Sequence, residues 1–148
     1  MGTRSTISFG SYANDKYTDP IVTIYQQYDG YISGVGHELA EWLLKKKIIN
    51  GIGVDQYTDE YANGVGCLAA QFIRDFKQKV GGLYIEEPKV REVCDYNYEV
   101  YVNEFIKVPP DGIPADDCVI IIVRNWDDET TNPLFVGKPS ELLEFEEL

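Results

Sequence analysis

A long run of alternating side chains in the second half of the chain places the strongest constraint on the fold. Between residues 96 and 108, one set of alternate positions begins Tyr96, Tyr98, Val100, Val102, and the other begins Asn97, Glu99, Tyr101, Asn103. A period of two places successive side chains on opposite faces of a sheet. The run therefore predicts a long strand with an apolar face, and that face needs a covering layer.

Shorter segments complete the pattern. Further strands are predicted at residues 3–9, 21–27, 83–87, 119–123 and 134–136, because these segments are rich in β-branched and aromatic residues. The apolar run 119–123 is typical of a strand buried on both faces. Apolar residues at helical spacing predict helices from about residue 33 to 50 and from 63 to 80. The order ββααββββ indicates one α+β domain over residues 1–148, with an antiparallel sheet packed against two helices.

The net charge of −12 is concentrated in the second half of the chain. Residues 1–80 carry 8 basic and 9 acidic side chains, whereas residues 81–148 carry 5 basic and 16 acidic ones. Acidic runs lie at 116–117, 127–129 and 144–147, and we expect an acidic C-terminal segment, either a short helix or a tail, from about residue 137 to 148. Such charge disfavours direct binding to nucleic acid or to an anionic membrane.

The cysteines and the single histidine argue against a metal centre. Cys67, Cys94 and Cys118 are widely spaced, no CxxC pair is present, and His37 is the only histidine. A zinc site usually takes four Cys or His ligands in close pairs. We therefore expect no metal and no cofactor, and reduced thiols typical of a cytoplasmic protein. No apolar run approaches the roughly 18 residues of a membrane span.

A ten-residue pattern occurs twice, each time at the start of a predicted helix. The first copy spans residues 27–36, and the second spans residues 56–66 with Thr58 as one additional residue. Both follow Q-Y-D-x-Y-x-x-G-V-G, so seven of ten aligned positions are identical. We find no third copy, which makes the pattern a pair and not the period of a solenoid.

The repeated pattern predicts a ligand site at two helix N-termini. Ser33 and Asn63 are good N-cap residues. Glycines leave the first-turn amides unshielded, and the partial positive charge of these amides favours an anion or a phosphate. Tyrosines would wall the site and stack on a ring. We predict ligand contacts from Gln27, Tyr28, Asp29, Tyr31, Ser33, Gly34, Gly36, His37, Gln56, Tyr57, Tyr61, Asn63, Gly64 and Gly66.

A purely structural explanation of the repeat stays open. The four glycines would also let two helices approach each other or the sheet closely. The tyrosines would then cap the core, with their hydroxyl groups in water. The pattern lacks the lysine of a P-loop and the parallel βαβ setting of a dinucleotide-binding fold, so neither fingerprint is present.

Part of the chain resembles a family of small proteins from phages, prophages and environmental sequences. The resemblance rests on MGTRS at residues 1–5, QYDGY at 27–31, GVG at 34–36 and NGVGCLAAQ at 63–71. It covers roughly residues 1–100 and leaves residues 109–148 unmatched. The family has no assigned activity and so transfers no catalytic residues. The resemblance implies an accessory protein of a virus or mobile element, acting in the host cytoplasm.

Three functions compete. The first is a non-enzymatic accessory protein with an anti-defence role, which binds a small anionic, nucleotide-like ligand at the two Gly-Val-Gly helix starts without turning it over. The second is an acidic inhibitor or DNA mimic that binds a basic host protein through residues 109–148. The third is a nucleotide hydrolase that uses His37 with Asp29 or Glu38. The sequence does not determine the oligomeric state, and it leaves open a homodimer in which the Tyr-rich strand at residues 96–101 pairs between subunits.

Overall fold

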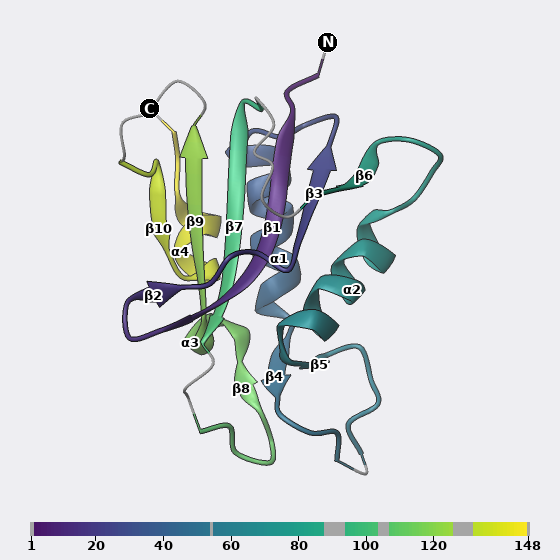
Figure 1. Ribbon diagram of the computed structural model, residues 1–148, viewed down its shortest axis with the longest axis vertical. Helices are drawn as coiled ribbons and strands as arrows, with labels where there is room; N and C mark the ends of the chain where they lie inside the picture. Colours follow the sequence, from purple (N-terminus) through teal and green to yellow (C-terminus); the bar gives the residue numbers. More distant parts are fainter. Residues whose placement is uncertain (1, 54, 88–93, 104–106, 126–131, 148) are drawn as a thin grey trace.

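A seven-stranded sheet forms the main layer of the protein (Figure 1). The computed structural model describes residues 2–53, 55–87, 94–103, 107–125 and 132–147. The strand order is β10-β9-β7-β1-β3-β6, with β2 paired to β1. The strands are β1 (Ser5–Ala13), β2 (Lys16–Tyr17), β3 (Val22–Gln26), β6 (Leu83–Glu86), β7 (Tyr96–Asn103), β9 (Val119–Asn125) and β10 (Phe135–Gly137).

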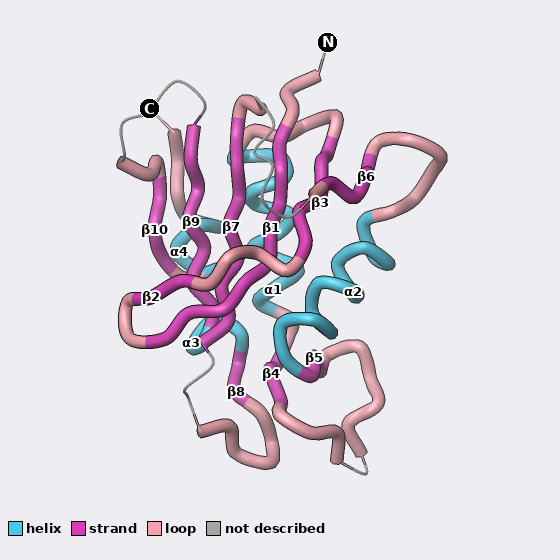
Figure 2. Tube along the Cα trace, viewed as in Figure 1, coloured by secondary structure: helices cyan, strands magenta, loops and turns pink. Residues whose placement is uncertain are grey.

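Helices pack on one face of this sheet, and a small second sheet lies at one end (Figure 2). The helices are α1 (His37–Leu44), α2 (Gly64–Phe76), α3 (Ala115–Cys118) and α4 (Pro139–Glu144), and a five-residue π-helix (Ile32–Gly36) leads directly into α1. The small sheet has the order β5-β4-β8 and consists of β4 (Lys47–Ile49), β5 (Tyr61–Asn63) and β8 (Ile113–Pro114).

Aromatic rings join the two long helices to the sheet. The ring centroid of Phe72 on α2 lies 5.4 Å from that of Phe9 on β1 and 5.6 Å from that of Trp42 on α1. Phe9 and Phe72 are fully buried. The helical stripes expected from the sequence therefore form the covering layer.

The α+β class is confirmed, but the expected purely antiparallel sheet is wrong. Strands β1 and β3 pair antiparallel as expected, with Ser5 paired to Gln26. Strand β7 instead runs parallel to β1, in a register from Ser5 with Tyr96 to Tyr12 with Asn103. Both long helices lie between these strands in the sequence, and a connection of that length allows a parallel return.

The helices also depart from expectation. The first ends at Leu44 instead of near residue 50, because residues 47–49 form β4. Lys46 is only 4% exposed, and its Nζ donates a hydrogen bond to the Asp59 carbonyl oxygen. Burial lowers the pKa of Lys46. The short helix α4 matches the helical alternative for the C-terminal segment, and α3 is a short helix that the sequence does not predict.

The acidic end of the chain is folded against the rest of the protein. Leu142 on α4 is fully buried, and the rings of Phe135 and Phe145 lie 5.2 Å apart. The Tyr96 hydroxyl donates to the Glu147 carboxylate at 2.8 Å, and burial with this contact raises the pKa of Tyr96 to about 12. The acidic run at residues 127–129 lies outside the described residues.

The sequence allows for two kinds of protein partner, a second copy of the chain and a basic host protein, and the structure limits the surfaces that are open to each. Strand β7 lies between β1 and β9, so its edges are not open to a second copy. Residues 109–148 supply β9 and β10 to the large sheet, β8 to the small sheet, and the helices α3 and α4. Asp116 in this region accepts hydrogen bonds from the backbone amide and hydroxyl of Ser140. Some of the acidic side chains thus stabilise the fold. Dimerisation by pairing of residues 96–101 is therefore wrong, whereas a homodimer through another surface and a basic protein partner stay predictions.

The three cysteines are expected to differ in reactivity. Cys94 and Cys118 are buried, whereas Cys67 is partly exposed. Burial raises the pKa of the Cys118 thiol to about 12, and the thiolate is the reactive form. We expect a thiol reagent to label one cysteine rapidly in the native protein and all three after denaturation. Peptide mapping should place the native label on Cys67; rapid labelling of Cys118 would contradict the packing of α3.

Candidate functional site

The two copies of the repeat lie at opposite ends of the helical layer. The first copy leads through the π-helix into α1, near the end of β3, and the second leads through β5 into α2 beside the small sheet (Figure 1). The chain then runs along α1 and α2 in opposite directions. A single small ligand cannot contact both helix starts, so the predicted site residues divide into two groups.

The helix-start amides of the first copy are already hydrogen-bonded. The amide of Gly34 donates to the Tyr31 carbonyl oxygen and that of Val35 to the Asp29 carbonyl oxygen, both at 2.9 Å. The Gly36 amide reaches the same Tyr31 oxygen at 3.5 Å. The expectation of free amides is therefore wrong for this copy. Ser33 lies inside the π-helix, and Tyr31 occupies the cap position.

The glycines of the first copy allow close packing. A Cβ atom on Gly34 would overlap the Asp29 carbonyl oxygen, and one on Gly36 would lie 3.2 Å from the ring of Tyr98. Tyr98 is fully buried, and its hydroxyl donates to the Gly30 carbonyl oxygen at 2.7 Å. Burial strongly raises the pKa of Tyr98. In this copy the structural explanation of the glycines holds.

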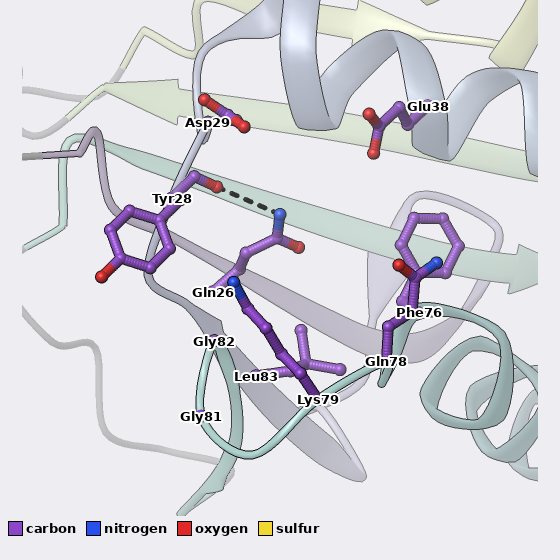
Figure 3. Close-up of a pocket in the computed structure, with 10 residues that line it drawn as sticks. All are labelled: Gln26, Tyr28, Asp29, Glu38, Phe76, Gln78, Lys79, Gly81, Gly82 and Leu83. Atoms are coloured by element: carbon purple, nitrogen blue, oxygen red, sulfur yellow. Dashed lines mark hydrogen bonds between the residues drawn. The ribbon is translucent and has the colours of Figure 1, made fainter.

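Tyr28 and Asp29 of the first copy nevertheless line a pocket of about 290 Å³ (Figure 3). The other lining residues come from the end of β3, from α1 and from the segment between α2 and β6: Gln26, Glu38, Phe76, Gln78, Lys79, Gly81, Gly82 and Leu83. This pocket, which we call the β3–β6 pocket, combines two aromatic rings, two carboxylates, two amides and one ammonium group. Among the predicted residues, Gln27 contributes only a backbone amide bond to the Gly82 carbonyl oxygen nearby.

Asp29 has an unusual backbone conformation at this pocket. Its φ of 59° lies in the left-handed region, which aspartate tolerates better than most residues. This conformation accompanies the bond from the Val35 amide to its carbonyl oxygen. Its carboxylate accepts a hydrogen bond from the Tyr31 hydroxyl at 3.3 Å, and the nearby negative charge raises the pKa of Tyr31.

The second copy is open where the first is closed. Gly64 has a φ of 80°, and no atom lies within 4 Å of a Cβ placed on Gly64 or on Gly66. Asn63 occupies the N-cap position, but its Oδ1 accepts a hydrogen bond from the Gly51 amide at 2.8 Å. The Asn63 side chain therefore makes no capping hydrogen bond to the first turn of α2. The expectation that Asn63 caps this helix with its side chain is therefore wrong.

A second pocket of about 400 Å³ lies at this helix start. Asn63, Gly64 and Val65 line it, together with residues from β1, β4 and β7 and from the segments that follow β4 and β7: Ser11, Ile48, Ile49, Asn50, Val102, Asn103 and Val108. None of these described lining residues is charged. This pocket, which we call the α2 pocket, thus pairs an uncapped helix N-terminus with amide, hydroxyl and apolar side chains.

The remaining residues of the second copy lie elsewhere. Gln56 holds the loop after β4, because its Oε1 accepts from the Gly53 amide and its Nε2 donates to the Pro110 carbonyl oxygen. Tyr57 is 78% exposed on the same loop. The carbonyl oxygen of Tyr61 accepts a hydrogen bond from Gln71 on α2. None of the three lines the α2 pocket.

His37 joins two helices. Its Nε2 lies 3.2 Å from the Phe145 carbonyl oxygen, at the end of α4. Because a carbonyl oxygen only accepts, Nε2 carries the proton in this contact. The ring therefore links the start of α1 to the C-terminal segment, and this structural role accounts for its position.

Comparisons with known proteins identify no relative of this chain. A scan against protein-family models, a search of curated proteins and a search of solved structures each find no match for the chain. Within the described residues, no helix is both long enough and apolar enough to cross a membrane. In the same part of the chain, no group of three or more His, Cys, Asp or Glu side chains is placed to hold a metal ion.

Proposed function

We propose that the protein binds a small anionic, nucleotide-like ligand in the α2 pocket without turning it over. The observation that carries this proposal is the uncapped start of a 13-residue helix beside a pocket whose described lining residues carry no charge. The first amides of a helix have no partner within the helix, and they carry partial positive charge. An anionic group is therefore favoured at this position.

The rest of the lining suits the remainder of such a ligand. Ile48, Val65 and Val102 supply apolar contact for a ring, and Ser11 and Asn50 supply hydrogen bonds. The volume of about 400 Å³ is within the range of small-molecule sites. The proposal confines the ligand to the second copy of the repeat.

The resemblance to phage and prophage proteins supplies a biological role for this binding. We propose that the protein acts as an accessory factor that sequesters a nucleotide signal of bacterial defence. Binding without turnover fits a pocket that contains no histidine and no carboxylate among its described lining residues. Mass spectrometry of protein purified from cells that make such a nucleotide would identify the compound that is retained.

The test uses a charge placed in the pocket. Asn50→Asp adds a carboxylate with almost no change in size, and we expect it to weaken ligand binding about tenfold, or roughly 1.4 kcal/mol. Asn132→Asp adds the same charge at an exposed position outside the pocket and is the matched control. Isothermal titration with cyclic dinucleotides and ADP-ribose-type nucleotides measures both. Equal affinity in the two variants would remove the α2 pocket from the proposal.

A further inference from the structure

We propose that the β3–β6 pocket is a second, independent site, which binds a small organic cation with N–H groups, such as a guanidinium or a primary ammonium. The pocket is formed by the end of β3, the start of α1 and the segment between α2 and β6 (Figure 3). This pocket would bind a cation, whereas the α2 pocket is proposed to bind an anion. The inference therefore does not depend on the proposed function.

The first observation is the balance of charge. Asp29 and Glu38 bring two carboxylates to the lining, and Lys79 brings the one ammonium group among the described residues there. Neither carboxylate forms an ion pair with any residue that the structure describes; Asp29 accepts only the neutral Tyr31 hydroxyl. The pocket therefore has a net negative charge, within a protein whose net charge is −12. Such a field attracts cations and repels anions.

The second observation is the position of the chain's own cation. The Lys79 Nζ lies 5.6 Å from the centre of the Tyr28 ring, inside the pocket. An ammonium over an aromatic face is attracted by the quadrupole of the ring. The side chain of Lys79 thus occupies a place that suits a ligand cation. Phe76 lies on the opposite side of the pocket and offers a second ring, on which a planar guanidinium would stack (Figure 3).

The third observation is an acceptor without a donor. The Nε2 of Gln26 donates to the Tyr28 carbonyl oxygen at 3.1 Å, which fixes the orientation of the amide. Its Oε1 is buried and accepts no hydrogen bond within the described structure. Buried polar atoms nearly always form a hydrogen bond, so a ligand with an N–H donor would be favoured beside this oxygen. Movement of Lys79 toward solvent would open the pocket to a ligand that supplies one.

The experiment removes a negative charge at one residue of the pocket and a positive charge at another. Binding of methylguanidinium is followed by NMR titration of the full chain, with tetramethylammonium as a cation that lacks N–H groups. Glu38→Gln should weaken binding about fivefold, since it removes one attracting charge. Lys79→Met keeps the length of the side chain and removes the competing ammonium, so it should strengthen binding about threefold. Glu41→Gln, which removes an exposed carboxylate of α1 outside the pocket, is the control and should change little.

Each outcome decides the proposal. Tighter binding in Lys79→Met together with weaker binding in Glu38→Gln supports a cation site, and the reverse pattern would assign the pocket to anions. Absence of saturable binding, or equal binding of tetramethylammonium, would overturn the proposal. Asn50→Asp should leave the cation affinity unchanged, so failure of one site is distinguishable from failure of the other. An arginine tripeptide is titrated in parallel to compare a guanidinium carried by a peptide with a free one. Affinity of the tripeptide at least equal to that of methylguanidinium would indicate a protein-borne guanidinium as the ligand.

Discussion

Gly36→Val is expected to lower the free energy of unfolding by about 3 kcal/mol, whereas Gly66→Val should change it by less than about 0.5 kcal/mol. The two glycines occupy the same position of the repeated pattern. A side chain at Gly36 would meet Tyr98, which is fully buried and bonded to Gly30, so that neighbour cannot move aside cheaply. A side chain at Gly66 would point into open space.

Thermal and denaturant unfolding of the two variants measures this contrast. For a chain of 148 residues, a loss of about 3 kcal/mol corresponds to a fall in Tm of roughly 6–12 °C. Gly66→Ala is a useful companion, because alanine favours a helix over glycine by about 1 kcal/mol and its single methyl group would meet no neighbouring atom. Equal losses in Gly36→Val and Gly66→Val would show that both copies are packed alike, contrary to the structure.

The repeat shows how far the sequence could predict this molecule. Two Gly-Val-Gly segments correctly predicted two helix starts, because the signals for a helix start are local. Whether those glycines are open or packed depends on residues far away in the chain. Tyr98 contacts Gly36 across 62 positions of sequence, and only the pairing of β7 with β1 brings it there. Similar sequence at two places therefore gave similar helices and different surroundings.

The same reasoning explains the candidate site. The sequence named Tyr28, Asp29, Asn63 and Gly64, which do line the two pockets. It missed Ser11, Val102 and Asn103, because the parallel register of β1 with β7 places them beside the start of α2. Side chains alternate between the two faces in parallel and antiparallel strands alike, so the sequence of residues 96–103 could not predict a parallel register.

The alternation at residues 96–103 correctly predicted the core face but not the burial of the other face. Glu99 lies on that second face and is 8% exposed. The β1–β2 hairpin crosses this side of the sheet, where the ring of Tyr17 lies 4.5 Å from that of Tyr101 (Figure 1). The Glu99 carboxylate accepts hydrogen bonds at 2.6 Å from both the Tyr101 hydroxyl and the Arg124 Nε. A charged residue can occupy this buried position because Arg124 on β9 is its partner.

Arg124→Met is therefore expected to lower the free energy of unfolding by about 2–3 kcal/mol. This loss is smaller than that for a fully buried ion pair, because the guanidinium is 30% exposed. Methionine keeps the apolar stem of arginine, so the loss reports mainly on the removal of the cation beside a carboxylate that is 10% exposed. Denaturant unfolding gives the size of the loss. Circular dichroism of the native state would show whether the sheet itself is preserved.

A double variant separates the charge from the packing. Glu99→Gln keeps an acceptor for the Tyr101 hydroxyl and removes the negative charge. Combined with Arg124→Met, it should recover the stability to within about 1 kcal/mol of the unchanged protein, because a buried ion pair replaced as a whole is often nearly neutral. The two substitutions would then show a coupling of at least about 1 kcal/mol. Simple additivity of the two losses would mean that Arg124 acts through its contacts with other residues, and that the burial of Glu99 depends on the hairpin alone.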